Sequence, residues 1–217
     1  MTTPDFTAAA TRAAETIVKY GISTAPVSPL PILKRLENVI VLSFSEMSDS
    51  SGISRGDLIP MFGKSRDAVT SIHTDNGRQI YVVAYNSLLP FAMIQRAIAR
   101  ELGHIILKHD GCSLVNTKEA ECFAMHLLCP RPLIHTIQAI GIRFTVDLLA
   151  NLTGIFDQTL LTIRHLPRTD VPANLNCFIR SQFMPFALNF FDYYQHVMPK
   201  DGSALADLGT FMDGYEE

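Results

Sequence analysis

The sequence contains no tryptophan, no long apolar run and no marked excess of either charge. Its 217 residues carry 18 basic and 21 acidic side chains, which gives a formal net charge of −3. A membrane-spanning helix needs about 20 consecutive apolar residues, and no stretch approaches that length. The lack of a basic excess argues against nucleic-acid binding that depends on overall charge. Because 47% of the residues are hydrophobic, a disordered chain is excluded and a core is expected.

Cysteine is also scarce, and the four cysteines indicate neither a Cys-x-x-Cys motif nor a disulfide framework. No two cysteines form a Cys-x-x-Cys pair, and the first residues lack the basic and apolar regions of a signal peptide. We therefore expect free thiols in a reducing compartment, and hence a cytoplasmic protein, rather than a disulfide framework. The four cysteines are Cys112, Cys122, Cys129 and Cys177.

The order of the predicted elements indicates an α+β fold, with strands first and helices later. Asn76-Gly77 predicts a tight hairpin turn, because both residues tolerate a positive φ. The Ser-, Gly- and Asp-rich residues 45–65 are predicted to be loop. The other elements expected before residue 90 are a helix over 5–20, a short helix ending near 37, a strand over 38–44 and hairpin strands over 67–73 and 79–85.

From Pro90 the apolar spacing changes to that of a helix, predicted over 90–109. Its apolar face is formed by Phe91, Ile94, Ile98, Leu102 and Ile105. On another face, Arg100-Glu101-Leu102-Gly103-His104 matches the His-Glu-x-x-His pattern of zinc peptidases except at its first position. In that pattern two histidines four residues apart hold the metal, and the glutamate activates water.

A second motif follows on the next predicted helix, over about 117–129. The run from Glu119 to Pro130, EAECFAMHLLCP, together with the Arg-Glu-Leu-Gly-His helix, resembles the ImmA/IrrE family of metallopeptidases (domain of unknown function 955). That family follows a His-Glu-x-Gly-His helix with a Glu-Ala-Asn/Asp-x-Phe-Ala-x-x-Leu-Leu-x-Pro helix. Glu121 departs from it, since the family has Asn or Asp there. The resemblance covers roughly residues 5–167.

The resemblance implies a zincin-like domain over residues 1–130, with a small antiparallel sheet and an active-site helix. A helix-turn-helix-like trihelical unit over 131–170 would follow it. Residues 171–217 lie outside the resemblance and form an aromatic segment with an acidic end.

The resemblance also implies the roles of the site residues. Glu101 would be the catalytic base, and His104 and Glu119 would be metal ligands. Arg100 cannot coordinate zinc, because a guanidinium has no lone pair to donate. We expect it to replace the charge of the metal by pairing with Glu101, Glu119 or both, so that no cofactor is bound; zinc is the expected cofactor if the protein is active.

Three nearby side chains are candidates for a replacement ligand. His109 lies five residues after His104, about 140° around a continuous helix, and is expected to point elsewhere. Cys122 is one helical turn from Glu119 and could approach an ion. His126 shares that helix face but lies too far along the axis for the same metal centre.

Residues 146–167 also fit a helix-turn-helix template, with Ala150 at the helix crossing and Gly154 at the turn. The second helix would cover 157–166, with Leu160 and Ile163 in the core. Its exposed face has few cations and begins with Asp157, so phosphate contacts would be weak. DNA binding is therefore an alternative, and packing against the peptidase-like domain is the simpler interpretation.

Three functions remain open. By resemblance, the protein acts on a helix-turn-helix repressor of a prophage, another mobile element or a stress regulon. The leading hypothesis is a regulatory protein that binds this repressor with a degenerate peptidase site, without a membrane or nucleic-acid partner. One alternative is an active metallo-endopeptidase, a hydrolase that cleaves the repressor with an altered metal site. The other is a DNA-binding transcription regulator acting through residues 146–167.

Overall fold

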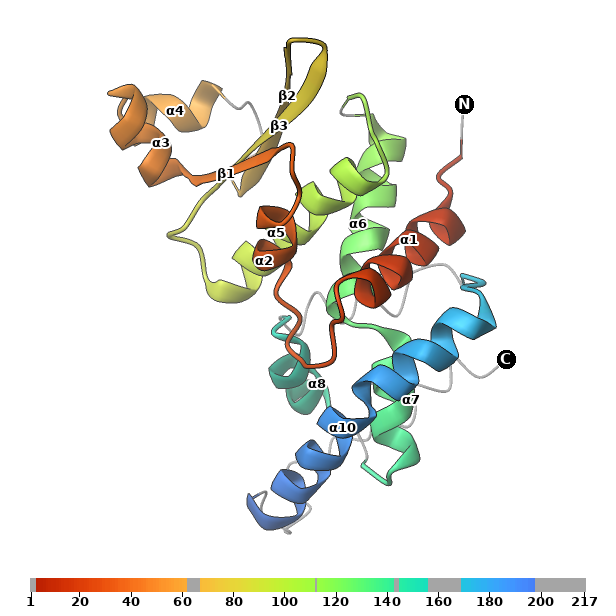
Figure 1. Ribbon diagram of the computed structural model, residues 1–217. Coiled ribbons are helices and arrows are strands. Elements are labelled where there is room, and N and C mark those ends of the chain that lie inside the picture. Colours follow the sequence, from red (N-terminus) through yellow and green to blue (C-terminus); the bar gives the residue numbers. More distant parts are fainter. Residues whose placement is uncertain (1–2, 62–66, 112, 143–144, 156–168, 198–217) are drawn as a thin grey trace.

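The protein has an α+β fold, in which a small sheet lies at one end and helices form the rest (Figure 1). The computed structural model describes residues 3–61, 67–111, 113–142, 145–155 and 169–197. Helix α5 packs on the sheet, α6 packs against α5, and α1 packs along α6. Helices α7, α8 and α10 lie at the other end of the molecule (Figure 1).

The predicted N-terminal helices are confirmed. Helix α1 covers Phe6–Lys19 and begins at Asp5, whose side chain accepts a hydrogen bond from the Ala8 N–H at 2.8 Å. Its buried face consists mainly of alanine, which lets α1 lie close to its neighbours α6 and α10. Helix α2 covers Pro29–Lys34 and begins with a proline, which suits the first turn of a helix.

Residues 45–61, the described part of the segment predicted to be loop, are mostly helical, contrary to the prediction from composition. Helix α3 covers Phe44–Ser51, and α4 covers Arg55–Met61. The first is stabilised by a capping box, in which the Ser43 side chain accepts from the Glu46 N–H at 3.1 Å and Glu46 accepts from the Ser43 N–H at 2.6 Å. Phe44 is fully buried. Capping and one buried aromatic therefore outweigh the weak helical preference of the serines.

The three-stranded sheet is mixed, so the prediction of an antiparallel sheet is only partly right. Strand β2 (Ala68–Asp75) and strand β3 (Arg78–Tyr85) form the predicted hairpin, with Asp75 opposite Arg78. Its two turn residues have positive φ, 49° for Asn76 and 76° for Gly77. Strand β1 (Val39–Ser43) lies parallel to β3, in the order β1-β3-β2. The α3–α4 connection supplies the length that this arrangement needs.

The two helices of the motif pack closely against each other. Helix α5 covers Phe91–Ile106, and α6 covers Leu114–Leu128 and ends before Pro130. Gly103 lies at their contact, where an added Cβ would be 3.0 Å from the Ala120 carbonyl oxygen. Gly103, the fourth residue of the Arg-Glu-Leu-Gly-His motif, therefore sets the distance between the two helices.

The predicted helix-turn-helix is described only in its first half. Helix α7 covers Arg131–Ala139, and α8 covers Val146–Thr153 and ends at Gly154, which has φ 67°. Leu149 and Ile155 are buried. The second helix predicted over 157–166, with Leu160 and Ile163, lies outside the described residues.

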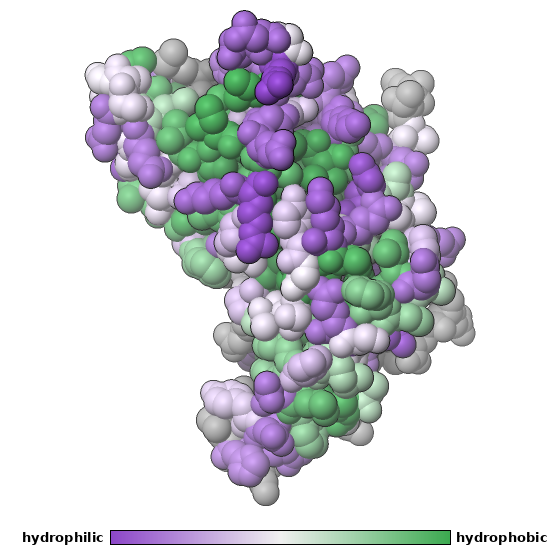
Figure 2. All heavy atoms as spheres, viewed as in Figure 1, coloured by the Kyte–Doolittle hydropathy of each residue, from purple (hydrophilic) through white to green (hydrophobic). Residues whose placement is uncertain are grey.

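Helix α10 (Ala173–Val197) shares the core of the rest of the molecule. It packs on α7 and α1, and the Gln182 side chain donates to the Ile22 carbonyl at 2.6 Å. Buried residues from all three predicted ranges join one hydrophobic cluster, while the boundaries at 130 and 170 stay predictions. Figure 2 shows apolar side chains on the exposed face of α10. The exposed large apolar residues of this helix are Phe178, Met184, Leu188 and Tyr193. None of the described helices combines the length and apolar character needed to span a bilayer.

Candidate functional site

The site begins where α5 ends, because the chain turns back sharply there. Lys108 has φ 57°, in the left-handed region. The His109 N–H donates to the His104 carbonyl at 3.0 Å, and the Lys108 N–H donates to the Ile105 carbonyl at 3.1 Å. These two bonds form a Schellman motif, with a lysine where glycine is usual. The motif folds His109 back over the last turn of α5.

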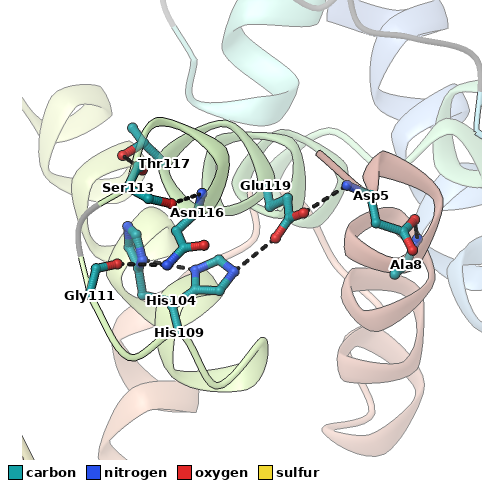
Figure 3. Close-up of polar contacts among 9 residues, drawn as sticks. All are labelled: Asp5, Ala8, His104, His109, Gly111, Ser113, Asn116, Thr117 and Glu119. Atoms are coloured by element: carbon teal, nitrogen blue, oxygen red, sulfur yellow. Dashed lines mark hydrogen bonds and ion pairs between the residues drawn. The ribbon is translucent and has the colours of Figure 1, made fainter. Parts of the chain in front are cut away.

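His109 consequently lies between the two residues predicted to be metal ligands (Figure 3). Its Nδ1 is 3.0 Å from Nδ1 of His104, and its Nε2 is 3.0 Å from Oε2 of Glu119. The His109 side chain is only 7% exposed. The expectation that His109 points elsewhere is wrong, because it assumed that the helix continues to residue 109, whereas α5 ends at Ile106.

The proton positions in this chain of contacts follow from Glu119. One of its oxygens accepts the Asp5 backbone N–H at 2.7 Å, and the other faces His109. A carboxylate only accepts hydrogen bonds, so the Nε2–H of His109 donates to Glu119. For neutral rings, Nδ1 of His109 then accepts from the Nδ1–H of His104. The His109 imidazole therefore links α5 to α6. Glu119 extends this chain of contacts to the N-terminus of α1.

The electrostatics agree with a neutral His104. Burial has the largest influence on its pKa and lowers it. The negative charge of Glu101 opposes this shift, while His109 and the Arg100 guanidinium lower the pKa further. At neutral pH the ring is therefore uncharged and available to donate one proton and accept one.

Arg100 pairs with Glu101, as one of the two predicted pairs requires. Its Nη2 and Nε atoms lie 3.1 and 3.2 Å from Glu101 Oε1, and Nη2 also donates to the Ala68 carbonyl at 3.4 Å. The second carboxylate oxygen of Glu101 accepts from the Thr70 hydroxyl at 2.7 Å. The predicted pair of Arg100 with Glu119 is not formed; Glu119 is contacted by His109 instead. Both oxygens of the buried Glu101 are thus hydrogen-bonded.

In this arrangement the side chains do not fit a zinc ion. The nitrogens of His104 and His109 that face each other share one proton, and the other nitrogen of His109 donates to Glu119. The lone pairs therefore do not converge on one point, whereas a zinc site needs three or four donors around a common centre. Among the described residues, no group of three or more His, Cys, Asp or Glu side chains is placed to hold a metal ion.

Cys122 is not placed to complete such a centre. Its thiol is fully buried and faces the Phe6 carbonyl at 3.6 Å, toward α1. Burial raises its pKa to about 12; the nearby Arg131 lowers it and Glu119 raises it. Because the thiol is buried and directed toward α1, this cysteine acts as a core residue.

A second ion pair holds α5 against α6 one turn before the motif. Arg96 contacts Glu121, with its Nε 2.7 Å from Oε1. Glu121 is the residue that departs from the family pattern, and its side chain is 21% exposed. Its role in this structure is a contact between the two motif helices.

Two residues of the site, Thr70 and His109, were missed by sequence reasoning. Thr70 lies on β2, and nothing in its sequence neighbourhood connects it with a glutamate 31 residues later. His109 could have been found by allowing the predicted helix to end about two to four residues earlier, which is the usual error in a predicted helix end. The absence of a glycine at position 108 concealed the reversal.

No family model, no curated protein and no solved structure matches this chain.

Proposed function

We propose that this protein is an ImmA/IrrE-like regulator that acts by binding a helix-turn-helix repressor in the bacterial cytoplasm, without cutting it. The repressor would belong to a mobile element or a stress regulon. The family and its partner class come from the two motifs in the sequence. The binding mechanism is supported by one observation: the His109 imidazole bridges His104 and Glu119.

The arrangement supports a structural role for the acidic residues of the motif. In a zinc peptidase the metal balances the charge of the ligand glutamate, and the base glutamate faces a water molecule. Here Glu119 accepts hydrogen bonds from His109 and Asp5, and Glu101 is balanced by Arg100. Because Glu101 is only 5% exposed and both of its oxygens are engaged, it is poorly placed to activate water.

Metal content is the first test. After incubation with zinc and dialysis, we expect elemental analysis to give well below one zinc per chain. The variant Arg100→His tests the same idea from the other side: it adds a histidine at the motif position, but His109 still separates His104 from Glu119. We therefore expect zinc uptake only when Arg100→His is combined with His109→Ala. Close to one zinc per wild-type chain would favour the altered metallopeptidase.

The second test separates binding from cleavage. A candidate helix-turn-helix repressor is mixed with wild-type protein or with Glu101→Gln, and its release from operator DNA is followed together with its length on a gel. Binding predicts equal release by both proteins and an intact repressor. Glu15→Gln is the control, because Glu15 pairs with Arg12 on the surface of α1, away from the motif. A fragment made by wild type and lost in Glu101→Gln would establish the peptidase instead.

A direct DNA-binding role would appear in the same assay. If the protein alone shifts the operator DNA, with an affinity that falls steeply as salt rises, the helix-turn-helix alternative through residues 146–167 is favoured. No shift by the protein alone, with release of the repressor, supports the proposal.

A further inference from the structure

A second site lies at the C-terminal end of the second motif helix, in a pocket of about 160 Å³. It is bounded by α1, the start of α7 and α10, with the last turn of α6 at its base. Figure 1 shows α1, α7 and α10 in this part of the molecule. The volume is close to that of a cavity of about 150 Å³ that accepts benzene, so a small organic molecule would fill it.

One wall of the pocket is cationic. It contains Arg131 from the first turn of α7 and Arg180 from α10, together with His126 and His135. The Arg180 Nη2 donates to Nδ1 of His135 at 2.9 Å, which fixes the position of the guanidinium. The Nη2 atom of Arg131 is shielded from solvent. No acidic side chain lines the pocket within the described ranges; Asp170, beside two lining residues, is exposed.

The charge of Arg131 reaches the interior of the pocket. Burial, together with the smaller effect of the positive charge of Arg131, lowers the pKa of His126 to about 4. His126 is therefore neutral at physiological pH and adds a polar but uncharged edge. The positive charges of this wall are those of the two guanidinium groups, which remain protonated at any physiological pH.

The other wall is apolar. Ala10, Ala14 and Ile17 of α1 face the pocket, and Ile179 of α10 lies beside them. Helices α1 and α10 contact each other directly. A ligand that satisfies both walls needs an anionic group at one end and a short hydrocarbon body at the other.

We propose that this pocket binds a small carboxylic acid with a short apolar body. Guanidinium groups bind carboxylates through paired hydrogen bonds, and the apolar wall would remove the hydrocarbon part from water. A fully hydrated anion such as inorganic phosphate would leave the apolar wall unsatisfied. The site is independent of the repressor hypothesis, because Arg100, Glu101, His104 and Glu119 do not line it.

Calorimetric titration of the full chain with hexanoate tests the assignment. From the affinity typical of small ligands per heavy atom, we expect a dissociation constant of about 0.1–1 mM. Hexanamide, which has the same body without the charge, should bind at least about tenfold more weakly. No hexanoate binding at about 10 mM, or tighter binding of phosphate than of hexanoate, would overturn the proposal.

The variant Arg180→Gln locates the site. Arg180 is exposed, so the fold should tolerate the change, and hexanoate affinity should fall about tenfold or more. Arg12→Gln removes an arginine from another face of α1 and should leave affinity unchanged. Methyl NMR is the second measurement: hexanoate should shift Ile17 and Ile179 and leave Ile72 on β2 unaffected. Equal loss in both arginine variants, or shifts at Ile72 alone, would place binding elsewhere.

Discussion

At the scale of single residues, the site is organised by a lysine in a conformation that lysine seldom adopts. Lys108 has φ 57°, which costs a residue with a Cβ about 1–2 kcal/mol relative to the right-handed helix. The reversal brings His109 into contact with both His104 and Glu119. The contacts of this single imidazole offset the strain, and they hold three partly buried side chains together.

Arg100 should contribute more to stability than the arginine one turn before it. Arg100→Ala leaves the buried Glu101 with only Thr70 as a partner, so we expect the free energy of unfolding to fall by about 1–3 kcal/mol. Arg96→Ala removes a more exposed pair, and a loss below about 1 kcal/mol is expected. Urea denaturation measures both.

The double variant Arg100→Ala/Glu101→Gln serves as the internal control. Without the carboxylate charge, the loss caused by removing Arg100 should shrink. If Arg100→Ala and Arg96→Ala lose the same stability, then Arg100 is not the partner that holds Glu101 in the interior.

At the scale of elements, the crossing of α5 and α6 positions the motif. Both helices carry site residues, and Gly103 allows their backbones to approach. The same glycine lies between Glu101 and His104 in the chain. The distance between α5 and α6 therefore also sets how these two site residues are placed relative to α6. The capping box at Ser43 and the Schellman motif at Lys108 define element ends in the same way, through a few local hydrogen bonds.

Gly103→Ala is expected to destabilise the protein in spite of the better helix preference of alanine. Its Cβ would lie 3.0 Å from both the Ala120 carbonyl oxygen and a ring carbon of Phe123. Overpacking of this kind costs about 1–3 kcal/mol, against a gain of up to about 1 kcal/mol from helix propensity. Thermal or urea unfolding gives the net change.

Gly56→Ala in α4 is the matched control. The nearest atom to its added Cβ is the Ser54 hydroxyl at 3.7 Å, an ordinary contact. This variant should be neutral or stabilised by up to about 1 kcal/mol. Equal behaviour of the two alanine variants would show that α5 and α6 can separate without loss.

At the scale of the whole molecule, buried histidines make stability depend on pH. The folded pKa of His126 is lowered from 6.5 to about 4, and burial also lowers that of His104. The unfolded chain therefore binds protons that the folded chain excludes. The stabilisation is complete above about pH 6.5 and is lost as the pH falls toward the folded pKa.

His126 alone should account for about 2 kcal/mol of lost stability between pH 7.5 and pH 5, from the difference between 6.5 and about 4. Urea denaturation at the two pH values measures the loss. In His126→Gln the pH dependence should be smaller by that amount. His196→Gln, on the exposed end of α10, should keep the wild-type pH dependence. An unchanged slope in His126→Gln would mean that this ring is protonated in the folded protein.

Several helices and strands can be predicted from short stretches of the sequence alone. The α5 and α6 helices follow from apolar spacing, the β2–β3 hairpin from Asn76-Gly77, and α1 from its Asp5 cap. The sequence also determined that Arg100 cannot be a metal ligand, because that follows from the chemistry of one side chain.

Contacts between residues that are distant in the chain could be seen only in the folded structure. The parallel pairing of β1 with β3, and the pairing of Thr70 with Glu101, join segments about 30 to 40 residues apart. The position of His109 depends on where α5 ends, and the reversal at Lys108 is held together with the contact to Glu119 on α6. A residue placed by packing and by a strained backbone leaves no local pattern, which is why the centre of the site was absent from the motif that located it.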